Sequence, residues 1–248
     1  MKITFMGTSH GVPSAERHCS STLIQTNGAS YIIDAGAPIY DEVLRAGVKY
    51  EEVRAIFTTH CHGDHINGIF HFIDLSQWYW KNSNYDVYLT SQAVIDAIHA
   101  VLNAVSPGAK FPEDRLRLHL ATAETKFEDE NINLSYIPTK HINDAHLSAA
   151  MDIEIEGKRI LFTGDMSQKL AKDDFPKVAF EKEYDLIVCE LAHFGIPELT
   201  PYLDRVKTKR FCFTHASERK FGDIAELAAS GKYPFLILHP NDGDVLEI

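Results

Sequence analysis

The sequence predicts an α+β protein in which two β-sheets pack together and helices cover their outer faces. Short β-rich segments occur in both halves of the chain, hairpin-type turns join some of them, and helical segments interleave with the rest. Strands joined by tight turns pair within one sheet, and the apolar face of a sheet needs a second layer to cover it. Two such regions in one chain therefore favour a layered sandwich.

The expected strands are short runs of apolar and β-branched residues bounded by turn residues. Asn27-Gly28 separates two runs in the first half and Glu156-Gly157-Lys158 separates two in the second, which indicates a hairpin at each place. The segments are Ile3–Met6, Thr22–Thr26, Tyr31–Asp34, Ala55–Thr58, Asp86–Leu89, Ile132–Ile137, Met151–Ile155, Arg159–Thr163, Leu186–Cys189, Arg210–Thr214 and Phe235–Leu238.

Three helices are expected between these strands. Pro38 suits the first position of a helix over Ile39–Ala46, and Gly47 suits its end. Thr90 or Ser91 can cap a helix that runs to about residue 105, and Phe221–Ser230 is followed by Gly231. In the second helix, helical spacing predicts one apolar face made of Val94, Ile98, Val101 and Val105.

The composition is typical of a folded globular protein, and we expect one domain over residues 1–248. Hydrophobic residues make up 45% of the chain and charged residues 24%, which argues against a disordered or fibrous protein. There are 24 Lys and Arg against 35 Asp and Glu, for a formal net charge of −11. Because broad binding to nucleic acid needs clustered basic residues, no stable nucleic-acid partner is expected.

Neither a membrane span nor a secretion signal is expected. No apolar run approaches the ~20 residues that a span needs, and the first residues lack the apolar segment of a secretion signal. The four cysteines are scattered without a CxxC pair, which indicates reduced thiols and a cytoplasmic protein.

The segment from His60 to His65 carries the strongest chemical signal in the sequence. His60, His62 and His65 provide three imidazoles and Asp64 a carboxylate, directly after an apolar strand. These ligand types suit zinc, iron or manganese. One ion could not easily bind all four from so short a span, so the spacing indicates two adjacent ions, one on His60 and His62 and one on Asp64 and His65.

This HxHxDH pattern resembles the hallmark motif of the metallo-β-lactamase superfamily. The resemblance implies a four-layer αββα sandwich, with two mixed β-sheets flanked by helices. It also implies that Asp34 supports a ligand imidazole, that His141 is the third histidine of the first ion, that Asp165 bridges both ions, and that His215 is the last ligand of the second ion. Two ligand positions keep an alternative, because His146 could replace His141 and His239 could replace His215.

The same resemblance implies two divalent transition-metal ions, with zinc favoured and manganese or iron as alternatives. Such a pair activates a bridging hydroxide near neutral pH and stabilises the leaving oxygen. Asp64 could also orient the hydroxide. No serine or cysteine nucleophile is required, and Cys61 is interpreted as a packing residue.

Two further segments resemble the ribonuclease Z and phosphodiesterase branch of the superfamily. One is Gly7-Thr8 followed by Pro13, and the other is Thr214-His215-Ala216-Ser217-Glu218-Arg219. In the second, Ser217 and Arg219 would suit a substrate phosphate. The competing interpretation of this pair is a helix cap and a surface ion pair, and His10 in the first segment is a candidate for a pocket role.

Two departures from that branch weaken an assignment to transfer-RNA processing. The interval from His141 to Asp165 has room for one hairpin and no RNA-binding arm. The usual His-Glu-Ala-Thr segment corresponds to Cys189-Glu190-Leu191-Ala192, so its histidine is missing, while His193 follows shortly after and could act as the general acid from a shifted position.

We therefore expect a binuclear metal-dependent hydrolase, foremost a phosphodiesterase acting on a phosphodiester or small molecule. The alternatives are a lactone or thioester hydrolase of the same fold, a ribonuclease Z-like nuclease, and a metal-binding module without turnover. The aromatic residues Trp78, Tyr79, Trp80 and Tyr85 are compatible with a homodimer contact, a substrate mouth or core packing.

Overall fold

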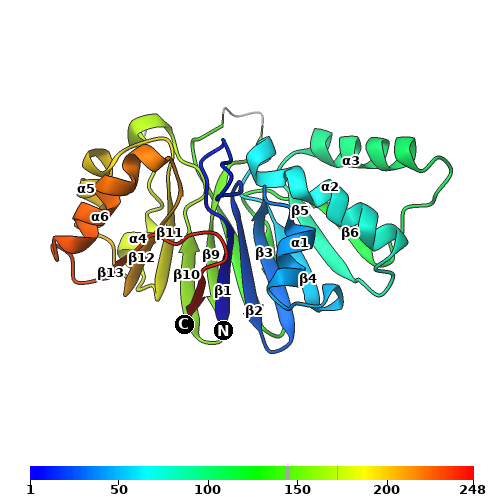
Figure 1. Ribbon diagram of the computed structural model, residues 1–248, viewed down its shortest axis with the longest axis horizontal. Coiled ribbons are helices and arrows are strands. Elements are labelled where there is room, and N and C mark those ends of the chain that lie inside the picture. Colours follow the sequence, from blue (N-terminus) through cyan, green and yellow to red (C-terminus); the bar gives the residue numbers. More distant parts are fainter. Residues whose placement is uncertain (143–145, 172) are drawn as a thin grey trace.

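The structure is a computed structural model that describes residues 1–142, 146–171 and 173–248. Its centre is a pair of seven-stranded sheets (Figure 1). The first sheet has the spatial order β14 (Val245–Glu247), β1 (Lys2–Gly7), β2 (Ser21–Thr26), β3 (Ala29–Ala35), β4 (Val53–Phe57), β5 (Tyr85–Leu89) and β6 (Leu116–Leu120). The second has the order β13 (Leu236–Leu238), β12 (Arg210–Ala216), β11 (Leu186–Leu191), β10 (Lys158–Phe162), β9 (Ala149–Ile155), β8 (Ile132–Pro138) and β7 (Lys126–Glu128).

Both sheets are mixed. Strands β1 to β3 are antiparallel neighbours and β3 to β6 are parallel, whereas β7 to β10 are antiparallel and β10 to β13 parallel. The tight turns expected at Asn27-Gly28 and Glu156-Gly157 exist, and both residues of each turn have positive φ. That backbone matches the right-handed twist of the paired strands.

Helices cover the outer face of each sheet (Figure 1). One group is α1 (Ile39–Arg45), α2 (Gly63–Trp78) and α3 (Gln92–Val105), with the short turn η1 (Tyr50–Glu52). The other is α4 (Val178–Glu181), α5 (Ile196–Leu203) and α6 (Phe221–Ala229), with the short turns η2 (Gln168–Leu170) and η3 (Glu218–Lys220). Three buried apolar clusters fill the spaces between these layers, one between the sheets and one under each group of helices. The expected αββα sandwich is confirmed.

The apolar face expected for α3 was only partly correct: Ile98 is buried and Val94 is half-buried against the apolar cluster under the helix, but Val101 and Val105 are exposed. Ile95, Ile98 and Leu102 are the buried residues of this helix, while Val101 and Val105 are 44% and 58% exposed. The helix packs on β5 and β6 through the narrow stripe of its longer side chains. The neighbouring strands β5 and β6 therefore decide which apolar residues of the helix are buried.

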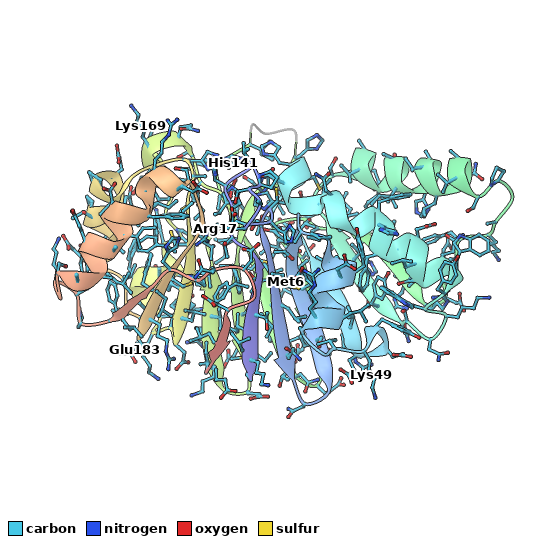
Figure 2. The ribbon with its side chains drawn as sticks, viewed as in Figure 1. Met6, Arg17, Lys49, His141, Lys169 and Glu183 are labelled. Atoms are coloured by element: carbon cyan, nitrogen blue, oxygen red, sulfur yellow. The ribbon has the colours of Figure 1, made fainter. Side chains whose placement is uncertain are left out.

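Loops at one edge of the sandwich carry the histidine and aspartate motifs. The HxHxDH segment connects β4 to α2, and His141 and Asp165 follow β8 and β10. Figure 2 shows His141 at this edge, between the two halves of the molecule. The fold therefore brings segments from both sheets to one place.

Candidate metal centre

The first sheet supplies four neighbouring donor side chains. His60 follows the buried end of β4 and is itself fully buried, while His62 is the residue just before α2 and is exposed. Asp64 and His65 lie in the first turn of α2. A carboxylate is stabilised there by the positive end of the helix dipole.

The second sheet supplies three donors from three separate loops or strand ends. His141 follows β8, Asp165 follows β10, and His215 lies near the end of β12. Gly164, directly before Asp165, has φ +56°, and a Cβ there would lie 2.4 Å from the carbonyl oxygen of Ala149. His215 itself has φ +48°, a left-handed conformation that non-glycine residues adopt rarely and that often marks a functional position.

His60, His62 and His141 form one lobe of the cluster. The distance from His62 Nδ1 to His60 Nε2 is 3.1 Å, and the distance from His62 Nδ1 to His141 Nε2 is 3.2 Å. Three imidazole nitrogens that face one another at this spacing could hold one transition-metal ion.

Asp64, His65 and His215 form a second lobe beside the first. Asp64 Oδ2 lies 3.4 Å from His65 Nε2 and 3.7 Å from His215 Nε2. This set mixes carboxylate and imidazole donors, which also suits a divalent transition metal.

Asp165 lies between the two lobes. Its Oδ2 atom is within 3.5–3.8 Å of imidazole nitrogens from both, namely those of His215, His65, His141 and His60. The side chain is only 3% exposed. One carboxylate in contact with both donor sets is the arrangement that a bridging ligand requires.

Hydrogen bonds on the far side of several imidazoles orient them toward the cluster. Nδ1 of His65 pairs with Asp34 Oδ2 at 2.8 Å, and Nδ1 of His215 pairs with the carbonyl oxygen of Ser9 at 2.9 Å. The Nε2 atoms of His65 and His215 then face the centre of the cluster, where each could bind a metal ion. Nε2 of His65 is buried and has no hydrogen-bond partner among the described residues, which fits a side chain that binds an ion.

The electrostatics of the cluster favour bound positive charge. Burial alone would raise the pKa of Asp165, but His215 and His65 hold it well below its usual range. Burial alone would lower the pKa of His65 and of His215, yet the carboxylates around them raise both. For His60, burial dominates and lowers the pKa. The carboxylates therefore attract either protons or metal cations to this site.

The two competing histidines lie outside the cluster. His146 is exposed and is absent from the donor groups found among the described residues, although residues 143–145 beside it lie outside the description. His239 packs edge-on against Phe221 with ring centroids 4.4 Å apart, and its buried Nε2 has no hydrogen-bond partner within the described parts of the chain. Proximity to the other donor side chains therefore favours His141 over His146 and His215 over His239 as metal ligands.

His193 lies at the rim of the cluster, with Nδ1 at 3.8 Å from Asp165 Oδ2. Its Nδ1 is also 3.0 Å from both carboxylate oxygens of Glu190, a buried residue at the end of β11. Burial would lower the pKa of His193, but the hydrogen bond and charge of Glu190 raise it. The sequence analysis quoted Glu190 only within a motif and assigned it no role.

Ser217 and Arg219 line a cavity of about 630 Å³ next to the cluster, together with His10. Ser217 precedes the short turn η3, and its side chain makes no capping hydrogen bond. Arg219 is exposed on that turn. The cavity adjoins His215 along the chain, so a bound group there would lie close to the metal donors.

The aromatic residues near the end of α2 are remote from the centre. Tyr85 is fully buried, and Trp80 stacks on Tyr50 with ring centroids 4.9 Å apart. Trp78 ends the 16-residue helix α2 that starts at the metal motif, so it lies ~24 Å away at 1.5 Å per residue. Tyr85 is thus a core residue, and the distance along α2 argues against a substrate-mouth role for Trp78. Tyr79 is 76% exposed, and a homodimer contact there stays a prediction.

Comparison with known proteins identifies the family. The profile of a family described as anti-Pycsar protein Apyc1 matches residues 1–226. The chain belongs to this family. Among curated proteins similar to this chain, ribonuclease Z of Picosynechococcus sp. is 29% identical over 144 residues, which cover 57% of this chain and 44% of the relative. Ribonuclease Z of Microcystis aeruginosa is 30% identical over 152 residues, covering 59% and 45%. The match thus spans less than half the length of these relatives.

Solved structures share the whole fold with this Apyc1-family chain. The metallo-β-lactamase fold protein YhfI of Bacillus subtilis has a TM-score of 0.77 at 18% identity, over 99% of both chains. The short form of human tRNase Z has a TM-score of 0.75 at 19% identity, over 100% of this chain and 99% of that one. These neighbours confirm the expected metallo-β-lactamase fold. No helix in the described part of the chain is long and apolar enough to cross a membrane.

Proposed function

We propose that this Apyc1-family protein is a binuclear metal-dependent phosphodiesterase. The observation that carries the proposal is the pair of donor lobes that share Asp165, built from both sheets. His60, His62 and His141 would hold one ion, and Asp64, His65 and His215 the other. Zinc is the favoured metal because imidazoles dominate both donor sets.

When bound, two such ions supply Lewis acidity and an activated water for attack on phosphorus. The remaining roles belong to the chain. Asp165 keeps the two donor sets at a fixed separation, and Asp34 and the carbonyl of Ser9 hold the imidazoles of His65 and His215 in orientation. Asp64 has a second carboxylate oxygen with which to orient the attacking water.

His193 is proposed as the general acid that protonates the leaving oxygen. Both oxygens of Glu190 lie within hydrogen-bonding distance of its Nδ1, which stabilises the protonated imidazole until the proton is delivered. The ring lies beside Asp165, and the preceding residue, Ala192, lines the same cavity as Ser217 and Arg219. A phosphate oxygen bound by those two side chains would place the leaving group near His193.

A compact substrate is proposed in preference to transfer RNA, which is the substrate named for the human neighbour. Among the described residues between His141 and Asp165, the secondary structure is the β9–β10 hairpin, and the whole interval is 24 residues long. The net charge of −11 also opposes broad contact with an RNA backbone. A small phosphodiester needs neither an RNA-binding arm nor a broad basic surface.

Arg219→Ala tests the substrate class. If Arg219 binds phosphate, its loss removes a charge-assisted hydrogen bond of about 1.5–3 kcal/mol and lowers kcat/KM on bis-p-nitrophenyl phosphate roughly tenfold or more. Metal content, measured by elemental analysis, should stay unchanged. A lactone has no anionic oxygen in its ground state, so its hydrolysis should change less.

The result that contradicts the proposal is a loss confined to the lactone, which would favour a lactone hydrolase. Equal losses on both substrates would make Arg219 a structural residue. Arg205→Ala is a matched control, because Arg205 lies over the ring of Phe180 on the helical layer of the second sheet. Its loss removes a cation–π contact without touching the cavity.

A further inference from the structure

We propose that Lys220 is a positioning residue that holds the loop carrying His193 and joins it to the turn carrying Ser217 and Arg219. This inference rests on the proposed function, in which His193 is the general acid. Lys220 is the last residue of η3, directly after the two candidate phosphate-binding residues. It contacts no metal donor through a hydrogen bond in the described structure.

The ammonium group of Lys220 uses all three of its hydrogen-bond donors on one loop. Nζ donates to the carbonyl oxygens of Leu191, Ala192 and Phe194 at 2.7, 2.9 and 2.7 Å. An ammonium group has three donors, so none is left for a substrate in this arrangement. The remaining carbonyl of the loop, that of His193, accepts a hydrogen bond from the backbone N–H of Lys169 at 3.0 Å.

Glu190 holds the same loop by its N–H groups. Its Oε2 accepts from the backbone N–H of Ala192 at 2.7 Å and from that of His193 at 3.1 Å, while the carboxylate also pairs with the His193 ring. The Lys220 ammonium group thus binds carbonyl groups of residues 191–194, and the Glu190 carboxylate binds N–H groups of the same segment. Charge-assisted hydrogen bonds of this kind are stronger than neutral ones.

The location of Lys220 gives this support a functional meaning. Arg219 and Lys220 belong to the short turn η3, Ser217 directly precedes it, and all three line the cavity beside the metal centre. Through Lys220 the same turn sets where the His193 loop sits. The group that binds phosphate and the group that protonates the leaving oxygen are therefore held at a fixed separation, which orientation-dependent catalysis requires.

Lys220→Met tests the inference with two phosphodiesters that differ in their leaving group. Diphenyl phosphate has a poor leaving group that needs a proton, whereas bis-p-nitrophenyl phosphate has a good one that does not. If Lys220 acts through His193, the variant should lose at least tenfold more kcat on diphenyl phosphate than on bis-p-nitrophenyl phosphate, with KM little changed. Lys220→Arg retains the charge and the donors, and should restore part of the difference.

A double variant separates positioning from direct contact with substrate. Lys220→Met should cost little further activity once His193→Gln is present, because both changes remove one function. Additive losses, or equal losses on both substrates with a raised KM, would overturn the proposal and make Lys220 a phosphate ligand. Lys207→Met is the control for charge, since Lys207 is an exposed lysine that precedes β12 at the end away from the centre.

Hydrogen exchange provides a readout that does not depend on activity. In Lys220→Met the amides of Ala192 and His193 should exchange faster than in the parent protein and in Lys207→Met. If the parent protein hydrolyses neither diester but these amides exchange faster in Lys220→Met, the proposed function fails while the positioning role stands. Unchanged exchange at these amides contradicts the positioning role whatever the activity.

Discussion

Asp165 is the residue on which both donor sets of the centre converge. Its buried carboxylate lies within 3.5–3.8 Å of the imidazoles of four candidate metal donors, two from each sheet, and 3.8 Å from that of His193. The same contacts keep it ionised, because His215 and His65 lower the pKa of Asp165 despite its burial. In the proposed centre, this single side chain would determine whether two ions can bind side by side.

Replacement of Asp165 tests this convergence. Asp165→Ala should lose at least one of two bound ions, since a bridging carboxylate serves both. Elemental analysis of the purified variant measures the number of ions per chain. Asp96→Asn, an exposed residue of α3, is the control for a lost negative charge. Two ions retained in Asp165→Ala would remove Asp165 from the centre.

His239 provides a pH-dependence that is separate from the metal centre. Burial first, and the charge of Arg17 second, lower the pKa of His239 from 6.5 to about 4. Between these two values the unfolded chain binds a proton that the folded chain does not. The contribution to stability is therefore full above pH 6.5 and is lost as the pH falls toward 4.

His239→Asn should flatten that dependence. Between pH 7 and pH 5 the variant should lose less unfolding free energy than the parent, measured by urea denaturation at each pH. Each protein is compared with itself, so the changed packing against Phe221 cancels. Both proteins keep the same candidate metal donors, so any stability lost through acid release of metal is the same in both and drops out of the comparison. Parallel losses in the two proteins would show that His239 is protonated in the folded state.

At the scale of secondary-structure elements, strand ends with left-handed backbone aim the functional side chains. Asp34 at the end of β3 and His215 at the end of β12 both have positive φ, at 56° and 48°. Neither is a glycine, so the surrounding structure must hold them in a sparsely populated conformation. After β10, Gly164 has the same left-handed backbone conformation. The carbonyl oxygen of Ala149 lies so close to it that a side chain would not fit.

Gly164→Ala should therefore displace Asp165 and destabilise the fold. Alanine pays about 1–2 kcal/mol for the left-handed conformation and adds a steric clash with the backbone of β9. The melting temperature and the number of metal ions per chain should both fall. Gly157→Ala is the matched control: Gly157 also has positive φ, but nothing lies within 4 Å of its added Cβ. Equal effects of the two changes would reduce the role of Gly164 to turn formation.

On the scale of the whole molecule, the candidate centre links the two sheets. His60, His62, Asp64 and His65 come from the first sheet and its helix, whereas His141, Asp165 and His215 come from the second. Bound ions would therefore add a connection between two layers that the apolar core and hydrogen bonds such as Ala149 N–H to the Thr59 carbonyl already join. Metal that binds only the folded state adds its binding free energy to stability.

Chelation should lower the melting temperature of the purified protein. Metal at a thousandfold excess over its Kd contributes about 4 kcal/mol, which corresponds to roughly 10 °C for a domain of this size. Removal with a chelator and restoration with zinc, followed by calorimetry, measure this difference. In Asp165→Ala the response to chelator should be much smaller. A parent protein that melts at one temperature in all three conditions contradicts a structural contribution from metal.

Local sequence was sufficient wherever the relevant residues are close together in the chain. The donors His60, His62, Asp64 and His65 were expected in one group, and strand-end geometry with the start of α2 does bring them together. The hairpins at Asn27-Gly28 and Glu156-Gly157 were equally predictable, because glycine adopts the positive φ of such turns without steric cost and adjacent residues alone form the turn. The layered fold followed from these short-range patterns.

Tertiary structure was needed wherever the partners are distant in the chain. Sequence left His146 and His239 as competitors, and only the packing of the loops after β8 and β12 brings His141 and His215 beside Asp165. The support of His193 by Glu190 and Lys220 has no sequence signature, because carbonyl groups occur in every residue and only folding decides which ones a lysine reaches. The buried face of α3 likewise depended on β5 and β6. Spacing along the chain encodes local geometry, but contacts between layers are set by the packing of both sheets.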